Sequence, residues 1–212
     1  ILTLMTWYLW LVIVALSVCT VSCLYHFYRI VSLGNPPEYA RKAGHIGKAV
    51  RYSFTGAMSP RNKESAYLHM PTYTAGIIYH LGTFLSIALF FAFLLRLFIP
   101  GWISPVLAIL TGLSAISGIA ILVKRISIYQ LRSLSNPDDY ISNILVTAFQ
   151  AATSFALFYG GPGISYFIIT ALLLFYFPLG KLKHAVYFFA ARYHLGSFYG
   201  WRGVWPPRSM RK

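Results

Sequence analysis

Five long apolar runs constrain this sequence more than any other feature, because each is long enough to cross a membrane. A helix needs roughly 20 apolar residues to span the hydrocarbon core of a bilayer. The runs cover residues 4–30, 73–98, 104–129, 140–159 and 163–192. The first has no basic segment before it and no small-residue cleavage site, so it indicates a span rather than a signal peptide. We therefore predict an all-α integral membrane protein of five transmembrane helices in a single membrane domain, residues 1–212.

The composition agrees with a lipid environment. Only 10% of the residues are charged, 58% are hydrophobic, and the mean hydropathy is +0.63. A soluble domain carries roughly 25% charged residues. So few charges leave too little polar surface to face water. We therefore predict that lipid surrounds most of the chain.

The positive charge is concentrated towards the ends of the runs and in the segments between them. The net charge is +14, with 18 basic residues, and such a charge can attract nucleic acid. Here, however, seven basic residues lie between positions 29 and 63, three between 124 and 132, and seven between 181 and 212. Arg96 is the remaining one. Because basic loops stay in the cytoplasm, we predict an outside N-terminus, a cytoplasmic loop 31–72, a cytoplasmic tail 193–212 and no nucleic-acid partner.

Two residue types limit the chemistry of the chain. Cys19 and Cys23 share one helix face in the first run, and we interpret them as small apolar residues. Two thiols are too few for an iron–sulfur cluster, which needs four protein ligands. The acidic residues are Glu38, Glu64, Asp138 and Asp139, all in loops or at a helix start. A transporter that relays protons through buried carboxylates is therefore disfavoured.

His80 is the histidine best placed for function, because it lies inside the second run. Ionisable residues within membrane spans are costly, and by default they indicate a functional site. A neutral buried histidine can instead bond a neighbouring helix, and that alternative stays open. Gly76 and Gly82 flank His80, and such small residues would let a flat macrocycle approach the helix backbone.

His184 is a candidate partner for His80. It lies near the cytoplasmic end of the fifth run, at a depth similar to that of His80 in the predicted topology. Two imidazoles on different helices at one depth suit the axial ligation of a haem iron. Lys181 and Lys183 would lie where cations can contact haem propionates. We interpret the remaining histidines as structural or interfacial: His26, His45, His69 and His194.

Three stretches together resemble one family of membrane cytochromes. They are Tyr79–Gly82, then Gly118–Arg125 with Arg132 and Asp138–Tyr140, and finally Leu174–His184. In this order, over most of residues 70–195, the chain resembles the membrane cytochrome b (gamma) subunit of respiratory nitrate reductase. It also resembles the membrane cytochromes of the Dsr, Hmc and Tmc complexes and of heterodisulfide reductase.

The resemblance implies which residues bind haem iron and how many haems are bound. The family holds two stacked haems, and the positions of its cytoplasm-proximal ligands match His80 and His184. The distal ligand positions are occupied here by Phe90 and Tyr166, which are not a ligand pair for a low-spin haem. The resemblance therefore implies a single haem b.

The resemblance also implies a respiratory role. The chain would be an electron-transfer subunit, not catalytic alone, in a multi-subunit complex of the prokaryotic cytoplasmic membrane. It would exchange electrons between the quinone pool (menaquinone or another quinone) and a cytoplasmic iron–sulfur subunit. Without a distal haem, we expect the quinone pocket on the inner side. Its candidate residues are His26, Arg29, Lys48 and Arg51. The alternative is a haem-free membrane anchor or assembly subunit of such a complex.

Overall fold

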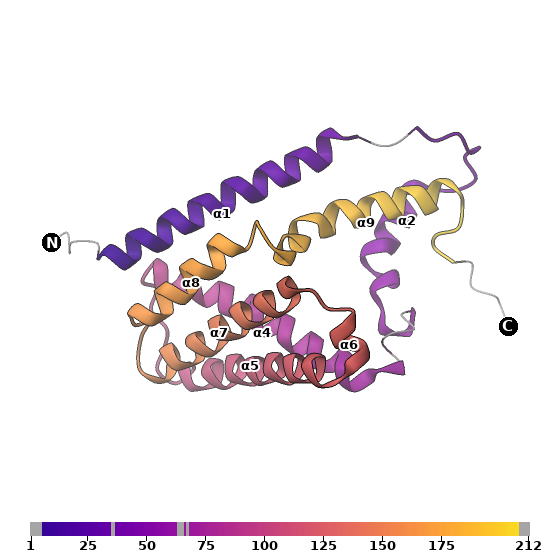
Figure 1. The fold of residues 1–212 in the computed structure, drawn as a ribbon. Helices are drawn as coiled ribbons and strands as arrows, with labels where there is room; N and C mark the ends of the chain where they lie inside the picture. The colour runs from indigo at the N-terminus through magenta and orange to yellow at the C-terminus, as the bar shows by residue number, and fades with distance from the viewer. Residues whose placement is uncertain (1–5, 35–36, 63–65, 67, 208–212) are drawn as a thin grey trace. The chain divides into compact units, whose positions relative to one another are not determined.

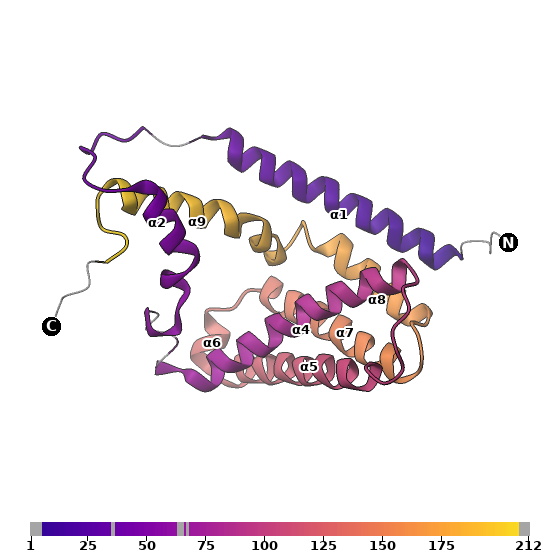
Figure 2. The ribbon, with the colours of Figure 1, turned by 180° about the vertical axis from the view of Figure 1, so that it is seen from behind.

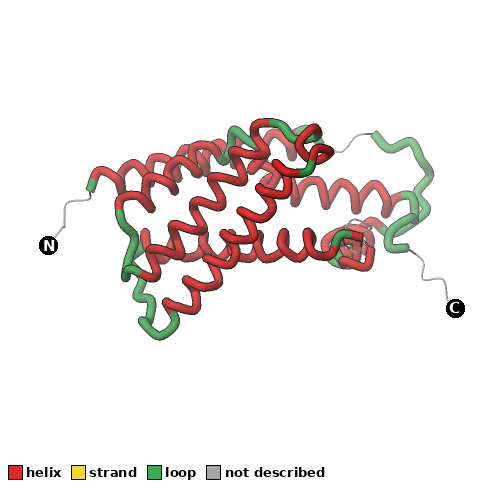
Figure 3. The backbone as a smooth tube through the Cα atoms, turned by 60° about the horizontal axis from the view of Figure 1, so that its bottom comes forward, coloured by secondary structure: helices red, strands yellow, loops and turns green. Residues whose placement is uncertain are grey.

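The computed structural model describes residues 6–34, 37–62, 66 and 68–207. Every element within these residues is a helix or a helical turn, and none is a strand (Figure 3). The long helices are α1 (Trp7–Ser32), α4 (Met70–Leu94), α5 (Ser104–Ser127) and α7 (Pro137–Phe158). The all-α class predicted from the sequence is therefore confirmed for the described residues.

These four helices are long and apolar enough to cross a membrane, and they coincide with the first four apolar runs. Their surfaces carry exposed apolar side chains, among them Leu81, Phe84 and Ile116, which are 63%, 65% and 62% exposed. A soluble monomer rarely leaves such continuous apolar faces uncovered. Contact with lipid accounts for them.

The fifth run, 163–192, is not the single continuous helix that the sequence predicts. It forms α8 (Ile164–Tyr176), the short turn η3 (Lys181–Lys183) and α9 (His184–Trp201), which together make a bent pair. Pro178 lies in the break and lacks the backbone N–H that a continuous helix would use. Among the residues that the structure describes, four helices can therefore span a membrane, or five if the bent pair is one span.

The segments predicted as a cytoplasmic loop and a cytoplasmic tail both contain helical residues. The loop 31–72 contains α2 (Ile46–Phe54) and the turns η1 (Gly56–Met58) and η2 (Pro60–Asn62). The tail predicted to begin at residue 193 is helical as far as Trp201, because α9 continues. Another short helix, α6 (Tyr129–Ser133), lies between α5 and α7.

The chain divides into two compact units. The first comprises Ile1–Val21 and Pro71–Leu182, and the second comprises Ser22–Met70 and Lys183–Lys212. The single membrane domain stays a prediction. Several charged residues lie outside the described residues: Lys63, Glu64, Arg208, Arg211 and Lys212. The first two positions of the first apolar run, 4 and 5, also lie outside them.

The core of the first unit lies among α4, α7 and α8, which Figures 1 and 2 show grouped with α5. Phe90 of α4, Phe149 of α7 and Tyr166 of α8 are buried in one cluster, and Val12 and Ala15 of α1 pack against them. Van der Waals contacts between closely packed side chains help to hold helices together where lipid replaces water. Aromatic rings therefore fill the centre of this unit.

Polar side chains join the helices of the first unit. The buried amide of Gln150 on α7 donates from Nε2 to the carbonyl of Tyr79, at 2.9 Å, and to the hydroxyl of Thr83, at 2.7 Å. Between α4 and α5 the backbones approach so closely that a Cβ on Gly82 would lie 2.1 Å from Cβ of Ser114. Small and hydroxyl-bearing residues hold helices together in this way within membranes.

The second unit is built on a close contact between α2 and α9. A Cβ on Gly196 would lie 2.5 Å from Cα of Val50, and one on Gly200 would lie 2.6 Å from Cβ of Ala49. The two glycines are four residues apart, so they lie on one face of α9. That face can approach α2 only because it carries no side chains at these positions.

Hydrogen bonds and an ion pair complete the second unit. The hydroxyl of Ser53 on α2 donates to the carbonyl of Arg192, at 2.7 Å. Beyond α9, the guanidinium of Arg202 contacts both carboxylate oxygens of Glu38, at 2.5 and 3.0 Å. The indole N–H of Trp201 donates to the carbonyl of Ala40, at 2.6 Å. The segment around residues 38–43 is therefore attached to the end of α9.

Candidate functional site

His80 lies on an exposed face of α4 in the first unit. Its Nδ1 is 2.7 Å from the carbonyl oxygen of Gly76, one turn earlier. When Nδ1 carries the proton and donates this bond, Nε2 carries the lone pair. Histidines that bind metals are usually held in this manner, with the second nitrogen bonded to a carbonyl or carboxylate. His80 is therefore oriented by its own helix as a potential Nε2 ligand.

The two glycines that flank His80 have different roles. A Cβ on Gly76 would meet nothing within 4 Å, so the helix surface beside His80 is open there. Gly82, by contrast, is in contact with Ser114 of α5. The expectation that both glycines leave room for a macrocycle is therefore wrong for Gly82, whose small size serves helix packing. Of the two glycines, only Gly76 leaves the helix surface beside His80 open.

The described residues contain no cluster of side chains that could hold a metal ion without a cofactor. Within them, no three His, Cys, Asp or Glu side chains form a group that could hold a metal ion. A haem iron needs fewer ligands from the protein, because the porphyrin supplies the equatorial nitrogens and the chain supplies only axial ligands. Axial ligation of a haem iron by His80 stays a prediction.

His184 is the first residue of α9 and belongs to the second unit. Its side chain is exposed. His80 and His184 thus lie on different helices, as expected from the sequence. Their joint ligation of one iron stays a prediction.

Lys181 and Lys183 lie in the turn η3, just before α9. The ammonium of Lys181 forms an ion pair with Asp139. The lysine side chain is 57% exposed, whereas the Asp139 side chain is only 6% exposed. Lys183 is half-buried. Lys181 therefore has a partner within the protein, and contacts of either lysine with propionates stay a prediction.

Asp139 is the centre of a polar cluster at the start of α7. Its carboxylate accepts from the backbone N–H of Asn136 at 3.0 Å, and the Asn136 side chain accepts from the N–H of Asp139 at 3.0 Å. This reciprocal pair is a capping box. The guanidinium of Arg125 on α5 is 3.6 Å from the same carboxylate. In the sequence, Asp139 stood out as an acidic residue in a loop or at a helix start and, with Arg125, through the family resemblance. The Asn-x-x-Asp spacing is the local signal of the cap.

The neighbouring Asp138 bonds a different set of helices. Its Oδ1 accepts from the hydroxyl of Ser142 at 3.0 Å and from the hydroxyl of Tyr176 at the end of α8. The two acidic residues therefore connect α5, α7, α8 and η3 within the first unit. Their role in this structure is to join helix ends.

Phe90 and Tyr166, which the resemblance places at the distal ligand positions, lie in the core of the first unit. Phe90 is 3% exposed and Tyr166 is 2% exposed, and both belong to the same buried cluster. The ring of Tyr166 is edge-on to that of Phe93, with centroids 5.5 Å apart, and 6.0 Å from that of Phe149. Packed aromatic rings occupy the space around these two positions.

The four predicted quinone-pocket residues are distributed over two helices of the second unit. His26 is half-buried, and its Nδ1 is 3.3 Å from the hydroxyl of Tyr187 on α9. The guanidinium of Arg29 lies 5.9 Å from the ring centroid of Tyr25 on its own helix. Lys48 and Arg51 are exposed on α2. Only His26 is bonded to a neighbouring helix through its side chain.

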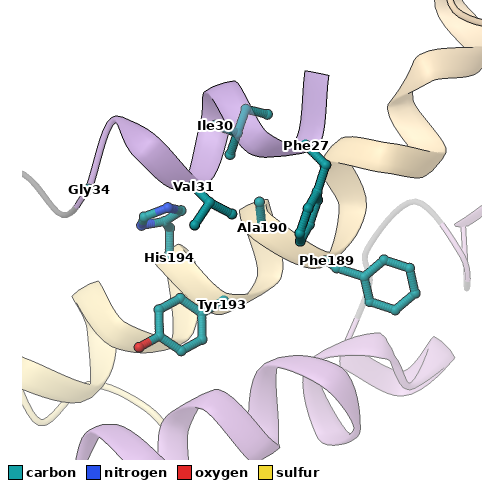
Figure 4. Close-up of a pocket in the computed structure, with 8 residues that line it drawn as sticks. All are labelled: Phe27, Ile30, Val31, Gly34, Phe189, Ala190, Tyr193 and His194. Atoms are coloured by element: carbon teal, nitrogen blue, oxygen red, sulfur yellow. The ribbon is translucent and has the colours of Figure 1, made fainter. Parts of the chain in front are cut away.

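A groove in the second unit lies beside His26 but does not include the four residues. It has a volume of about 330 Å³. Residues from the end of α1 and from α9 line it (Figure 4): Phe27, Ile30, Val31, Gly34, Phe189, Ala190, Tyr193 and His194. The sequence predicted an interfacial His194 but did not predict this groove. The only sequence signal of the groove was that apolar residues alternate with Tyr193 and His194 on α9.

A second cavity, of about 580 Å³, lies in the first unit at the ends of α4 and α7. Its lining is mostly apolar, and Arg96 contributes a cation. Arg96 has a φ of +53°, which is uncommon for a residue other than glycine. Arg96 is also the basic residue that the predicted topology assigns to the outer side.

No protein-family model, curated protein or solved structure matches this chain. A functional assignment therefore rests on the fold and on the placement of the side chains.

Proposed function

We propose that this chain is a membrane-bound b-type cytochrome subunit that carries one haem between His80 and His184. The observation that carries the proposal is the bond between Nδ1 of His80 and the carbonyl of Gly76. It fixes the tautomer that ligation through Nε2 requires, on a face that Gly76 leaves open. Haem b, once bound, would supply a one-electron carrier.

The aromatic core supports a single haem rather than two. Phe90 and Tyr166 are buried together among other rings, and a macrocycle at that level would have to displace them. Displacing packed core side chains costs several kcal/mol. The chain's own residues therefore favour one haem, on the side of the first unit that carries His80.

In the cell, we propose an electron-transfer subunit of a respiratory complex in a prokaryotic cytoplasmic membrane. The basic segments support a cytoplasmic position for the 31–72 segment and for the C-terminus. The partner would be an iron–sulfur subunit on that side, because two cysteines cannot hold a cluster. The membrane-soluble partner would be a quinone.

The haem proposal is tested on the purified protein. A reduced-minus-oxidised spectrum should show a b-type band, and a pyridine haemochrome assay should give one haem per chain. The His80→Ala and His184→Ala variants should lose most of the haem. His45→Ala is a matched control, because His45 is exposed and makes no capping bond at the start of α2. Added imidazole should restore the band of His80→Gly.

Each outcome of this experiment has a defined meaning. A band that survives unchanged in both histidine variants would show that the ligand assignment is wrong. Two haems per chain would contradict the interpretation of Phe90 and Tyr166. No haem in the parent protein would favour the alternative, a haem-free membrane anchor or assembly subunit.

A further inference from the structure

The groove between α1 and α9 has the chemistry of a small-molecule site. Phe27 and Val31 of α1 face Ala190 and His194 of α9 across it (Figure 4). Its volume of about 330 Å³ lies at the lower end of the range for sites that bind small ligands, roughly 300–1,000 Å³. Such sites are mainly apolar with a few polar groups, and here the polar side chains are those of Tyr193 and His194.

The lining selects against charged ligands. None of the eight lining residues is Lys, Arg, Asp or Glu. A phospholipid phosphate would lack a cation here and would lose its hydration on entry. A neutral, flat head group with carbonyl acceptors suits the groove better, because an imidazole or phenol can donate to a carbonyl.

The groove lies where a lipid-soluble ligand can reach it. It is bounded by the end of α1, a helix long and apolar enough to cross a membrane. On this part of α1, Leu24 is 62% exposed, Tyr28 is 70% exposed and Val31 is 57% exposed. An apolar tail could lie along this face while the head group enters between the helices.

The bond between His26 and Tyr187 fixes one end of the groove. The imidazole of His26 precedes Phe27 on α1, and the hydroxyl of Tyr187 on α9 is 3.3 Å from its Nδ1. The two rings also meet edge to face, with centroids 6.1 Å apart. This contact holds the two helices together at the level just before the lining residues.

We propose that this groove binds the head group of an isoprenoid quinone, with the imidazole of His194 donating to a quinone carbonyl. The choice of a quinone rests on the proposed electron-transfer function, whereas the site rests on the groove itself. His184 and His194 are ten residues apart on the same helix, which separates them by about 15 Å along its axis. One helix thus carries both the proposed axial ligand and the proposed quinone contact.

The test measures binding directly, without electron transfer. The full chain in nanodiscs of phosphatidylcholine is titrated with menaquinone that has a single isoprene unit, by calorimetry. Ala190→Phe fills the groove and should weaken binding at least tenfold. Ala191→Phe is its matched control, because Ala191 is the next residue on α9, is exposed and does not line the groove. The control should bind as the parent does.

Two further variants test the hydrogen bond. His194→Phe removes the donor and should weaken binding about tenfold, the usual effect of one hydrogen bond. His194→Gln keeps an N–H donor and should recover part of the affinity. These variants also carry the test if Ala190→Phe does not fold, which circular dichroism would show.

The outcomes separate this inference from the proposed function. Haem content is measured on every sample. Quinone binding that is equal in the parent, Ala190→Phe and His194→Phe would refute the groove, whether or not haem is present. Groove-dependent binding in a chain without haem would refute the cytochrome and leave the quinone site in place. No binding by the parent would also refute the groove.

Discussion

Replacing Gly196 with alanine should loosen the contact between α2 and α9. The new Cβ would lie 2.5 Å from Cα and 3.0 Å from the backbone N of Val50. Backbone atoms cannot rotate away as a side chain can, so the two helices would have to separate by about 1 Å to restore ordinary van der Waals contact. Overpacking of this kind costs about 1–3 kcal/mol.

A second glycine in the same helix pair allows that cost to be isolated. Alanine is favoured over glycine within a helix by up to about 1 kcal/mol, and this gain would mask part of the clash. Gly47 lies in α2, and a Cβ there would meet nothing within 4 Å. Gly47→Ala therefore receives a gain of the same kind, somewhat smaller in the first turn, without the clash. The difference between the two variants reports the overpacking.

Hydrogen–deuterium exchange is the suitable assay, because two compact units need not unfold together. Amides of residues 46–54 should exchange about fivefold to more than a hundredfold faster in Gly196→Ala than in Gly47→Ala. Peptides from α5 and α7, in the first unit, provide the internal reference. If exchange in α2 were unchanged or slower in Gly196→Ala, the close approach of α2 and α9 would be incorrect.

Three further predictions concern polar contacts. Asp139→Ala removes the capping box and the carboxylate that pairs with Lys181, and it should lower the stability of the first unit by about 1–3 kcal/mol in thermal unfolding; a change below about 0.3 kcal/mol would contradict this role. Gln150→Leu removes the buried amide between α4 and α7, and it should cost about 0.6–1.7 kcal/mol in the same assay; a stabilised variant would contradict it. The backbone N–H of Ala40 and the guanidinium of Arg202 lower the pKa of the Glu38 carboxyl. The contacts of the ionised carboxylate therefore stabilise the fold above about pH 4.3, the ordinary pKa of a glutamate. They are lost as the pH falls through the lowered pKa. Protection factors, which are corrected for the intrinsic pH dependence of amide exchange, should therefore fall on acidification for residues 38–44 in the parent and depend less on pH in R202A.

The sequence determined the class of this protein and the positions of most of its helices. Runs of roughly 20 apolar residues can satisfy their backbone in lipid only as helices. The run at 104–129, for example, corresponds to α5, Ser104–Ser127. The spacing of Asn136 and Asp139 likewise indicates the start of α7, since a capping box is a local motif. These features depend on neighbours within one or two turns of chain.

The sequence also predicted His80 as a candidate site residue, but it did not show how the His80 side chain is oriented. His80 and Gly76 are four residues apart, so their hydrogen bond is local to α4. The packing of Gly82 against α5 instead depends on Ser114, 32 positions away. Pro178 was visible in the sequence, yet the apolar run around it predicted one continuous span. Hydropathy averages over the window and does not detect a single missing N–H.

Only the tertiary structure decided which side chains meet. The family resemblance predicted that Phe90 and Tyr166 are not a haem ligand pair, but their burial in one cluster depends on helices brought together by packing. The same is true of Lys181 with Asp139, and of the groove that joins Phe27 to His194. Contacts between residues far apart in the chain follow from shape complementarity between helix faces. A one-dimensional pattern of apolar residues does not specify that complementarity.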